Sequence, residues 1–264
     1  MTMRKVTAGR GAAWINESIS SLKNIGMPFW SQALIIGFLG SVPYLSMLQG
    51  VLVLFFYGSL VLCLNNSNGK NNAFSGFKNG NFIRLLPILI LNMVAAVIVI
   101  AALWSELKLA VEVSMQGQQL SNDQAVAMVL AILKHILWMI PMLILLSWVS
   151  QLAVPLATIG EQPGVASLKI ATQAVFSNLP AMIVNLICLF LALVVISIIC
   201  IIPIALISAT LASNQMLMQI IIIPFTTVMT AILIALLSAN MLFAYRDIFG
   251  ETEAGITKDS EFLM

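Results

Sequence analysis

The chain has 264 residues, of which 61% are hydrophobic and only 8% are charged, and its mean hydropathy is +1.05. One soluble core cannot bury that much apolar surface, so the composition predicts a membrane protein. The net charge of +2 and the dispersed lysines and arginines give no electrostatic footprint for phosphates, which excludes nucleic acid as a partner.

Six apolar runs follow one another along the chain. A helix needs about 20 apolar residues to cross about 30 Å of hydrocarbon, and these runs are of that order. No Asp, Glu, Lys, Arg or His lies between Lys23 and Lys70, or from position 170 to position 245. The predicted transmembrane spans are 28–43, 45–64, 82–104, 136–159, 180–203 and 216–245.

The first two runs could instead form one long helix. The uncharged stretch 28–64 is too long for a single crossing, and Pro43 removes a backbone donor and restricts the residue before it. We therefore predict a tight turn at Pro43 between two permanent spans.

The basic residues segregate with this topology. Six crossings put both termini and the segments 65–81 and 160–179 on one side, which then carries ten of the twelve lysines and arginines. Lys108 and Lys134 lie on the other side. Because basic loops stay in the cytoplasm, we predict cytoplasmic termini.

Two further predictions concern the domain and its external segment. Residues 1–250 are predicted to form a single transmembrane domain, and 251–264 a flexible cytoplasmic tail. On the external side, Ser121 and Gln124 have the spacing of a capping box, which predicts a helix that leads into the fourth span.

Each cytoplasmic segment before an odd-numbered span is predicted to form an interfacial amphipathic helix. The second of these, over 73–82, is weakened by its glycines. The apolar stripe of the first comprises Trp14, Ile15, Ile19, Leu22 and Ile25. That of the third comprises Val165, Leu168, Val175 and Phe176.

A short motif recurs where these helices lead into spans. A bulky apolar residue and an asparagine precede a proline, and proline suits a first helical turn because its missing N–H would be unpaired there. The three copies are Leu22, Asn24 and Pro28; Phe77, Asn79 and Pro87; and Phe176, Asn178 and Pro180. The repeat predicts an all-α fold of three hairpins, each preceded by an interfacial helix.

Asn92, Asn185 and Asn240 lie deep in the predicted spans. An unpaired amide in hydrocarbon costs several kcal/mol, so each is predicted to contact a neighbouring helix. No span has an Asp, Glu, Lys, Arg or His at its middle, which disfavours a proton-driven transporter. Four prolines are expected to kink or end helices, and broken helices can line binding sites: Pro141, Pro155, Pro203 and Pro224.

Charged residues at the cytoplasmic helix ends are candidates for contacts with lipid headgroups or with a partner: Lys78, Arg84, Arg246 and Asp247. His135 is the only histidine and has no Cys or carboxylate at ligand spacing, so it predicts neither a metal site nor a triad. The sequence has no phosphate loop, paired carboxylates or zinc-protease motif. We therefore expect no catalytic activity and no cofactor.

Three stretches carry a family resemblance: the opening "MRKVTAGRGAAWINES", the central "FSGF" and the closing "LFAYRDIFG". Together they resemble a family of uncharacterised bacterial inner-membrane proteins of about this length. The plan is more distantly similar to the membrane domain of some glycerophosphodiester phosphodiesterases, whose soluble catalytic barrel this chain lacks. The resemblance implies a bacterial inner membrane and no established function.

Two functions remain open at this point. The first is a non-catalytic accessory, scaffold or assembly partner of another membrane complex or of itself. The alternative is a carrier of lipids or small amphiphiles, with a groove between hairpins. A tightly packed bundle would argue against the carrier.

Overall fold

The computed structural model of the protein describes residues 3–42, 45–66, 74–78, 80–105, 108, 122–210 and 215–250. These are helical apart from short connections, and no strand occurs among them. The helices are α1 (Ala8–Leu22), α2 (Met27–Ser41), α3 (Leu45–Asn65), the single turn η1 (Ser75–Phe77), α4 (Asn81–Ala102), α6 (Asn122–Thr158), α7 (Gly164–Ser177), α8 (Leu179–Thr210) and α9 (Gln215–Phe249). The predicted tail 251–264 lies outside the described residues.

Four helical segments of the described chain are long and apolar enough to cross a membrane: Asn81–Ala102, Val126–Thr158, Leu179–Leu206 and Ile221–Phe249. The prediction of an all-helical membrane protein is confirmed to that extent. By contrast, α2 has 15 residues, or about 22 Å of helix, which is less than the hydrocarbon thickness. α3 contributes the shorter apolar segment Leu52–Asn65.

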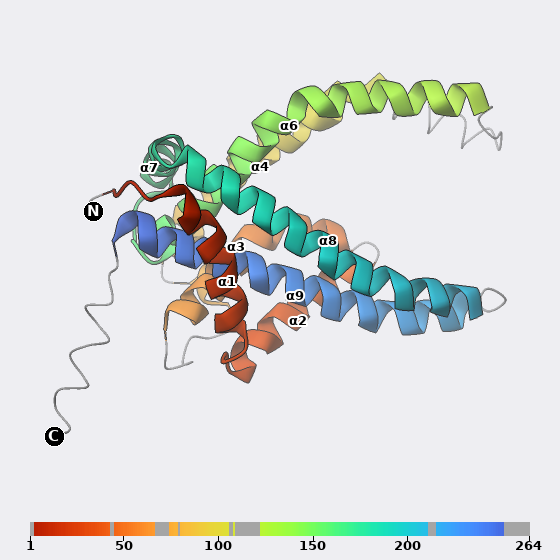
Figure 1. The fold of residues 1–264 in the computed structure, drawn as a ribbon, viewed down its shortest axis with the longest axis horizontal. Coiled ribbons are helices and arrows are strands. Elements are labelled where there is room, and N and C mark those ends of the chain that lie inside the picture. Colours follow the sequence, from red (N-terminus) through yellow and green to blue (C-terminus); the bar gives the residue numbers. More distant parts are fainter. Residues whose placement is uncertain are drawn as a thin grey trace.

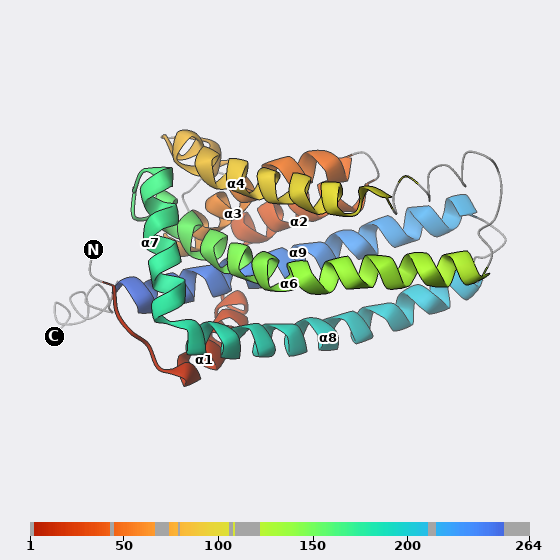
Figure 2. The same ribbon diagram turned by 90° about the horizontal axis from the view of Figure 1, so that it is seen from above.

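The long helices form two arms that leave a common end of the molecule. α4 packs against α6 in one arm, and α8 packs against α9 in the other (Figure 1). α1 and α7 lie across the long helices at the common end (Figure 2), and we call this region, with the adjoining helix ends, the collar. The N–H of Arg4 donates to the carbonyl of Ile248 at 2.7 Å, so both ends of the described chain meet in the collar.

Three helices extend beyond the spans predicted for them. α6 begins at Asn122 and continues past 136, the predicted start of the fourth span, as expected of a helix that leads into that span; 122–140 contains no Gly or Pro and is rich in strong helix formers. Ser121 of the expected capping box lies outside the described residues. α8 and α9 also run beyond 203 and 245, to Thr210 and Phe249.

None of the four mid-span prolines ends a helix. Pro141 and Pro155 lie inside α6, Pro203 inside α8 and Pro224 inside α9. Membrane helices tolerate proline because neighbouring helices and local adjustments satisfy the freed carbonyls. These prolines were expected to kink or end helices, and they do not end them.

Two of the three segments predicted to form interfacial helices are helical, as α1 and α7, and their position at a membrane surface stays a prediction. The second is only the turn η1, because Gly80 adopts a left-handed φ of +76° immediately before α4. Pro87 is consequently an interior residue of α4, so the prediction that it opens a helix is wrong. Pro28 and Pro180 do lie in the first turns of α2 and α8. Asn79 is not among the described residues.

The buried faces of α1 and α7 differ from the predicted apolar stripes. Trp14 and Ile15 are buried, but Ile19 is 43% exposed. On α7, Val165 and Phe176 are 70% and 61% exposed. The buried face of α7 consists of Val175, from the predicted stripe, and four small residues: Gly164, Ser167, Ala171 and Ala174. The small side chains let the helix backbones approach closely.

Close backbone contact is also what fixes the collar helices. A Cβ on Gly11 would lie 2.1 Å from the carbonyl oxygen of Ala181 on α8. A Cβ on Gly164 would lie 2.1 Å from the carbonyl oxygen of Arg84 on α4. Each glycine therefore marks a crossing that no larger residue fits.

Candidate functional site

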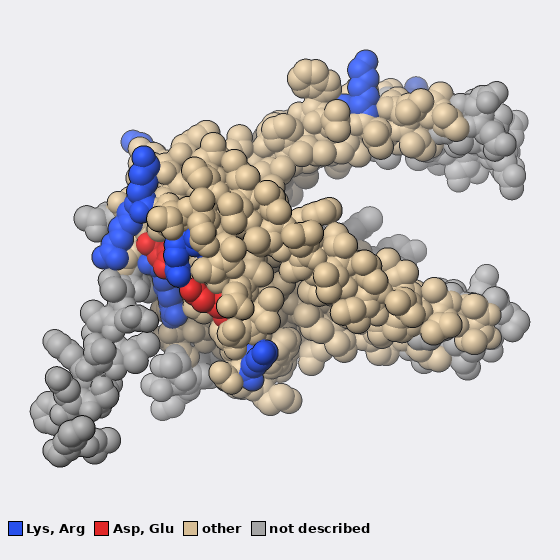
Figure 3. Space-filling model, in the orientation of Figure 1, with Lys and Arg blue, Asp and Glu red and all other residues tan. Residues whose placement is uncertain are grey.

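A groove separates the two arms. Figure 3 shows the open hollow between the arm of α4 and α6 and the arm of α8 and α9. Its inner end holds two cavities of about 290 Å³ and about 370 Å³. Both are lined by Leu143, Ser147, Gln151 and Leu237, so they are adjoining lobes of one groove. We call the smaller the α8 lobe and the larger the α4 lobe, after the helix that completes each wall.

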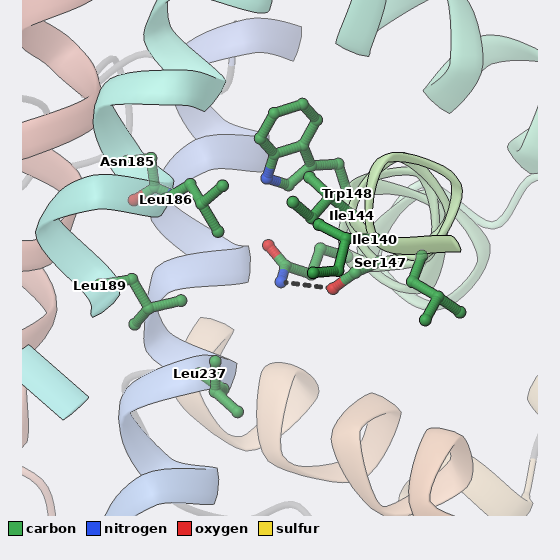
Figure 4. A pocket seen from close by; sticks show the side chains of 10 residues that line it. Ile140, Ile144, Ser147, Trp148, Asn185, Leu186, Leu189 and Leu237 are labelled. Atoms are coloured by element: carbon green, nitrogen blue, oxygen red, sulfur yellow. Dashed lines mark hydrogen bonds between the residues drawn. The ribbon is translucent and has the colours of Figure 1, made fainter. Parts of the chain in front are cut away.

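The α8 lobe is an apolar chamber with a few polar groups. Its walls are mainly Ile140, Ile144, Leu186 and Leu189. The indole nitrogen of Trp148 points across the gap toward α8, and Gln151 Nε2 lies 3.3 Å from Ser147 Oγ (Figure 4). Asn185 lines the same lobe, is 1% exposed, and its Oδ1 has no hydrogen-bond partner among the described residues.

The α4 lobe lies between α3, α4, α6 and α9. Asn92 in its wall donates from Nδ2 to Ser150 Oγ at 2.9 Å and to the carbonyl of Ile88 at 2.8 Å. The first bond joins α4 to α6. Tyr57 and Ala95 also line this lobe, and most of its remaining wall is apolar, with Leu54, Leu146 and Met241.

The polar groups of the groove lie well inside the bundle. Ser147 precedes Thr158, the last residue of α6, by eleven positions, or about 17 Å of helix, and Gln151 lies one turn closer to that end. Asn185 follows the start of α8 by about 9 Å. If the collar lies at the membrane surface, these groups lie at the depth of the hydrocarbon.

The groove carries no fixed charge. Among the described residues that line the two lobes there is no Asp, Glu, Lys, Arg or His. Nor do the described residues contain a group of three His, Cys, Asp or Glu that could hold a metal ion. The side chains of the groove can therefore donate and accept hydrogen bonds, but they offer no counter-ion to a charged ligand.

The charged side chains gather in the collar. Asp247 Oδ2 accepts from Arg10 Nε at 2.5 Å and from Trp14 Nε1 at 2.6 Å, which joins α9 to α1. Arg10 Nη1 also lies 3.0 Å from Glu17 Oε1. The hydrogen bond to Asp247, with the negative charges of both carboxylates, raises the pKa of Arg10 above its ordinary value.

The predicted headgroup or partner contacts all lie at the collar. Arg246 Nη2 donates to Asn65 Oδ1 at 2.8 Å, so this arginine and Asp247 join helices within the chain. Arg84 Nη2 lies 3.3 Å from the exposed Glu161, and Lys78 is exposed. A role of these four residues in binding lipid or a partner stays a prediction.

The three predicted intramembrane asparagines have different surroundings. Asn92 bonds across helices to Ser150, whereas Asn185 lines the groove. Asn240 is fully buried on α9, and neither atom of its amide has a partner among the described residues. The structure therefore singles out Asn185 as the buried amide that a ligand in the groove can reach.

The groove residues on α6 were not predicted from the sequence. Ser147 and Trp148 are adjacent, and Gln151 follows Ser147 by about one turn of helix, in a run that is mostly apolar. The cluster "SWVSQ", 147–151, is the signal that could have identified them, since polar groups on a membrane helix face protein or a cavity.

No known protein family, no curated protein and no solved structure matches the chain. The family resemblance of its opening, central and closing stretches therefore stays a prediction. The fold and the groove define the class: an all-helical protein with four helices able to cross a membrane and an uncharged groove between two arms.

Proposed function

We propose that the protein binds a lipid or another small amphiphile in the groove between its arms. The observation that carries this proposal is the two-lobed groove, which is apolar on most of its wall and has hydrogen-bonding groups at its inner end. Ligand sites are typically apolar concavities with a few convergent polar groups. The proposal assigns the chain binding or carriage and no catalytic step.

The proposed setting is a bacterial inner membrane crossed six times, with the collar at the cytoplasmic surface. The meeting of Arg4 and Ile248 supports an even number of crossings. Most described basic residues lie at the collar, where the positive-inside rule favours the cytoplasm (Figure 3). α2 is too short to cross a bilayer of ordinary thickness. A crossing would require local thinning of the bilayer, and α2 packs against α3 and α9, which would hold it in place.

Filling the groove tests the proposal directly. Leu237 lines both lobes, so Leu237→Trp places a large ring where the ligand would lie. In native mass spectrometry of protein released from bacterial-lipid nanodiscs, we expect lipid adducts on the unaltered protein and few on this variant. Leu206→Trp is the matched control, because Leu206 is exposed on the distal part of α8. Equal adducts on both variants would contradict the proposal.

A scaffold or assembly partner is the second candidate function, and the distal arms favour it. In the most apolar 18-residue stretch of the α6 segment Val126–Thr158, no residue is buried by the rest of the chain. Leu130, Leu137 and Trp138 on that arm are 62%, 66% and 81% exposed. Such surfaces fit lipid tails or the helices of another protein.

Photo-crosslinking separates these two occupants. A photoreactive amino acid at position 137 should capture a defined protein band in intact cells if the arm serves assembly. The same residue at position 83, an exposed site on α4 near the collar, is the control. Capture of lipid alone at position 137 would count against the scaffold.

A further inference from the structure

We propose that the groove selects an uncharged amphiphile in which two apolar chains meet at a polar hub of ester or hydroxyl groups, as in a diacylglycerol. This inference rests on the proposed function and names the class of ligand. It has three supports: the shape of the groove, its hydrogen-bonding groups and its lack of charge.

The shape is forked. The two lobes adjoin along one stripe of α6, at Ser147 and Gln151, and along Leu237 of α9. From that shared wall the α8 lobe extends toward α8, and the α4 lobe extends toward α3 and α4. Beyond that shared wall each lobe is mostly apolar. A single chain would fill one lobe only, whereas two chains joined at one point would fill both.

The hydrogen-bonding groups gather at and beside the junction of the lobes. Ser147 and Gln151 are shared by both lobes, while Trp148 and Asn185 line the α8 lobe beside them. The indole N–H and the Gln151 amide N–H groups can only donate, so they suit acceptors such as ester carbonyls. The Asn185 amide can rotate by 180°, so it can offer either an N–H or its unpartnered oxygen to a hydroxyl.

The lack of charge decides between neutral and ionic lipids. A phosphate at the junction would lie at hydrocarbon depth with no basic residue among the described lining of either lobe. Arg84, on the same helix as Asn92, lines neither lobe and lies 3.3 Å from Glu161. A neutral hub needs no counter-ion and is satisfied by the donors present.

Competitive photolabelling tests the inference. The full chain is placed in nanodiscs that contain one lipid with a diazirine in an acyl chain: a diacylglycerol, a phosphatidylglycerol or a phosphatidylcholine with identical chains at equal mole fraction. We expect the diacylglycerol to label peptides containing 143–151 and 185–189 about tenfold more than either phospholipid, because a buried unpaired charge is disfavoured by at least that factor.

The outcomes separate this inference from the proposed function. Equal labelling of these peptides by a phospholipid would overturn the neutral-ligand inference and leave amphiphile binding intact. An absence of labelling by all three lipids would overturn both.

Variants then test the named residues. Asn185→Leu and Gln151→Leu should each lower diacylglycerol labelling about fivefold to tenfold, the effect of losing one hydrogen bond at low dielectric. Asn240→Leu is the matched control for Asn185, because Asn240 is also a buried amide but does not line the groove. Unchanged labelling of both groove variants would overturn the hub.

Gln151→Glu keeps the shape of the side chain and adds a carboxylate at a partly exposed site, so it serves even if Asn185→Leu fails to fold. It should lower diacylglycerol labelling at pH 8 by more than it does at pH 5, where more of the carboxylate is protonated. Equal labelling at the two pH values would contradict the charge argument.

Discussion

The collar and the arms are built from different interactions although both consist of apolar helices. In the collar, backbones touch at Gly11 and Gly164, and Asp247 joins two helices through Arg10 and Trp14. In the arms, most of α6 and α8 faces outward. Since lipid tails are as apolar as leucine, hydrophobicity alone does not hold helices together in a bilayer. Close packing and polar contacts do, and they are concentrated at one end of this molecule.

The largest effect should come from a collar glycine. Gly11→Ala puts a methyl group against the backbone of Ala181 and Asn185, neither of which can move without shifting α8. We expect a loss of about 3 kcal/mol in the free energy of unfolding, or failure to fold, because overpacking against backbone is not relieved by rotamer changes. Thermal unfolding in mild detergent measures it.

The matched control lies on the same helix. Gly9 has no atom within 4 Å of its hypothetical Cβ, so Gly9→Ala should leave stability unchanged or raise it by about 0.5 kcal/mol through helix propensity. Similar destabilisation by both substitutions would show that α1 is not docked through Gly11.

The next largest effect should come from Asp247. Asp247→Asn removes the negative charge that accepts from Arg10 and Trp14. We expect a loss of about 1.5 kcal/mol in the free energy of unfolding, at the low end for charged hydrogen bonds because the side chains of Arg10 and Asp247 are partly exposed. Glu17→Gln is the control and should cost less than about 0.5 kcal/mol, as exposed ion pairs do. The reverse order would contradict the role given to Asp247.

The same network makes a prediction about pH. The folded-state pKa of Arg10 is raised above its unfolded value, so its contribution to stability is complete below the unfolded pKa and is lost only as the pH rises through the folded one. The difference in stability between the unaltered protein and Arg10→Gln should therefore not change through titration of this arginine between pH 6 and 9. A decline of that difference within this range would contradict the assignment.

A smaller effect should come from the polar link within an arm. Asn92→Leu removes the hydrogen bond to Ser150, and we expect a loss of about 0.6 to 1 kcal/mol, as for other hydrogen bonds between membrane helices. Ser150→Ala completes a double-mutant cycle, in which the coupling energy should account for most of that loss. Additive effects of the two substitutions would mean that the bond does not hold α4 to α6.

The smallest effect should come from the distal surface. Trp138→Ala removes a side chain that is 81% exposed, and we expect a change of less than about 0.5 kcal/mol in the unfolding of the isolated chain. A loss above about 1 kcal/mol would show that this surface is buried in a self-association that the single chain does not contain.

The sequence was sufficient to predict what depends on hydropathy along the chain. The all-helical class and the approximate location of each long helix follow from apolar runs and charge gaps, as at the uncharged stretch 170–245. The ends of helices were less predictable. No breaker separates Asn122 from the predicted start of the fourth span at 136, and α8 continues through Pro203 to Thr210.

What the sequence could not provide is which surfaces meet. Val165 and Phe176 were predicted to share the apolar stripe of an interfacial helix, and both are exposed, but the face of α7 that packs against the rest of the chain was not predicted. The asparagines were identifiable as polar groups in hydrocarbon. The two asparagines are distinguished only by how the helices are arranged: Asn185 on α8 lines the lobe formed with α6 and α9, whereas Asn240 on α9 does not line the groove.

The most direct test of the account is the separation of the arms in a bilayer. Spin labels are placed in nanodiscs at exposed positions on a background without Cys63, Cys188 and Cys200, and pulsed dipolar spectroscopy measures two pairs: 137 with 98 within one arm, and 137 with 198 across the groove. The account predicts a longer distance across the groove than within the arm, and a narrower distribution when diacylglycerol is added. A distance across the groove as short as that within the arm would mean that the arms are closed on each other and that there is no groove to fill.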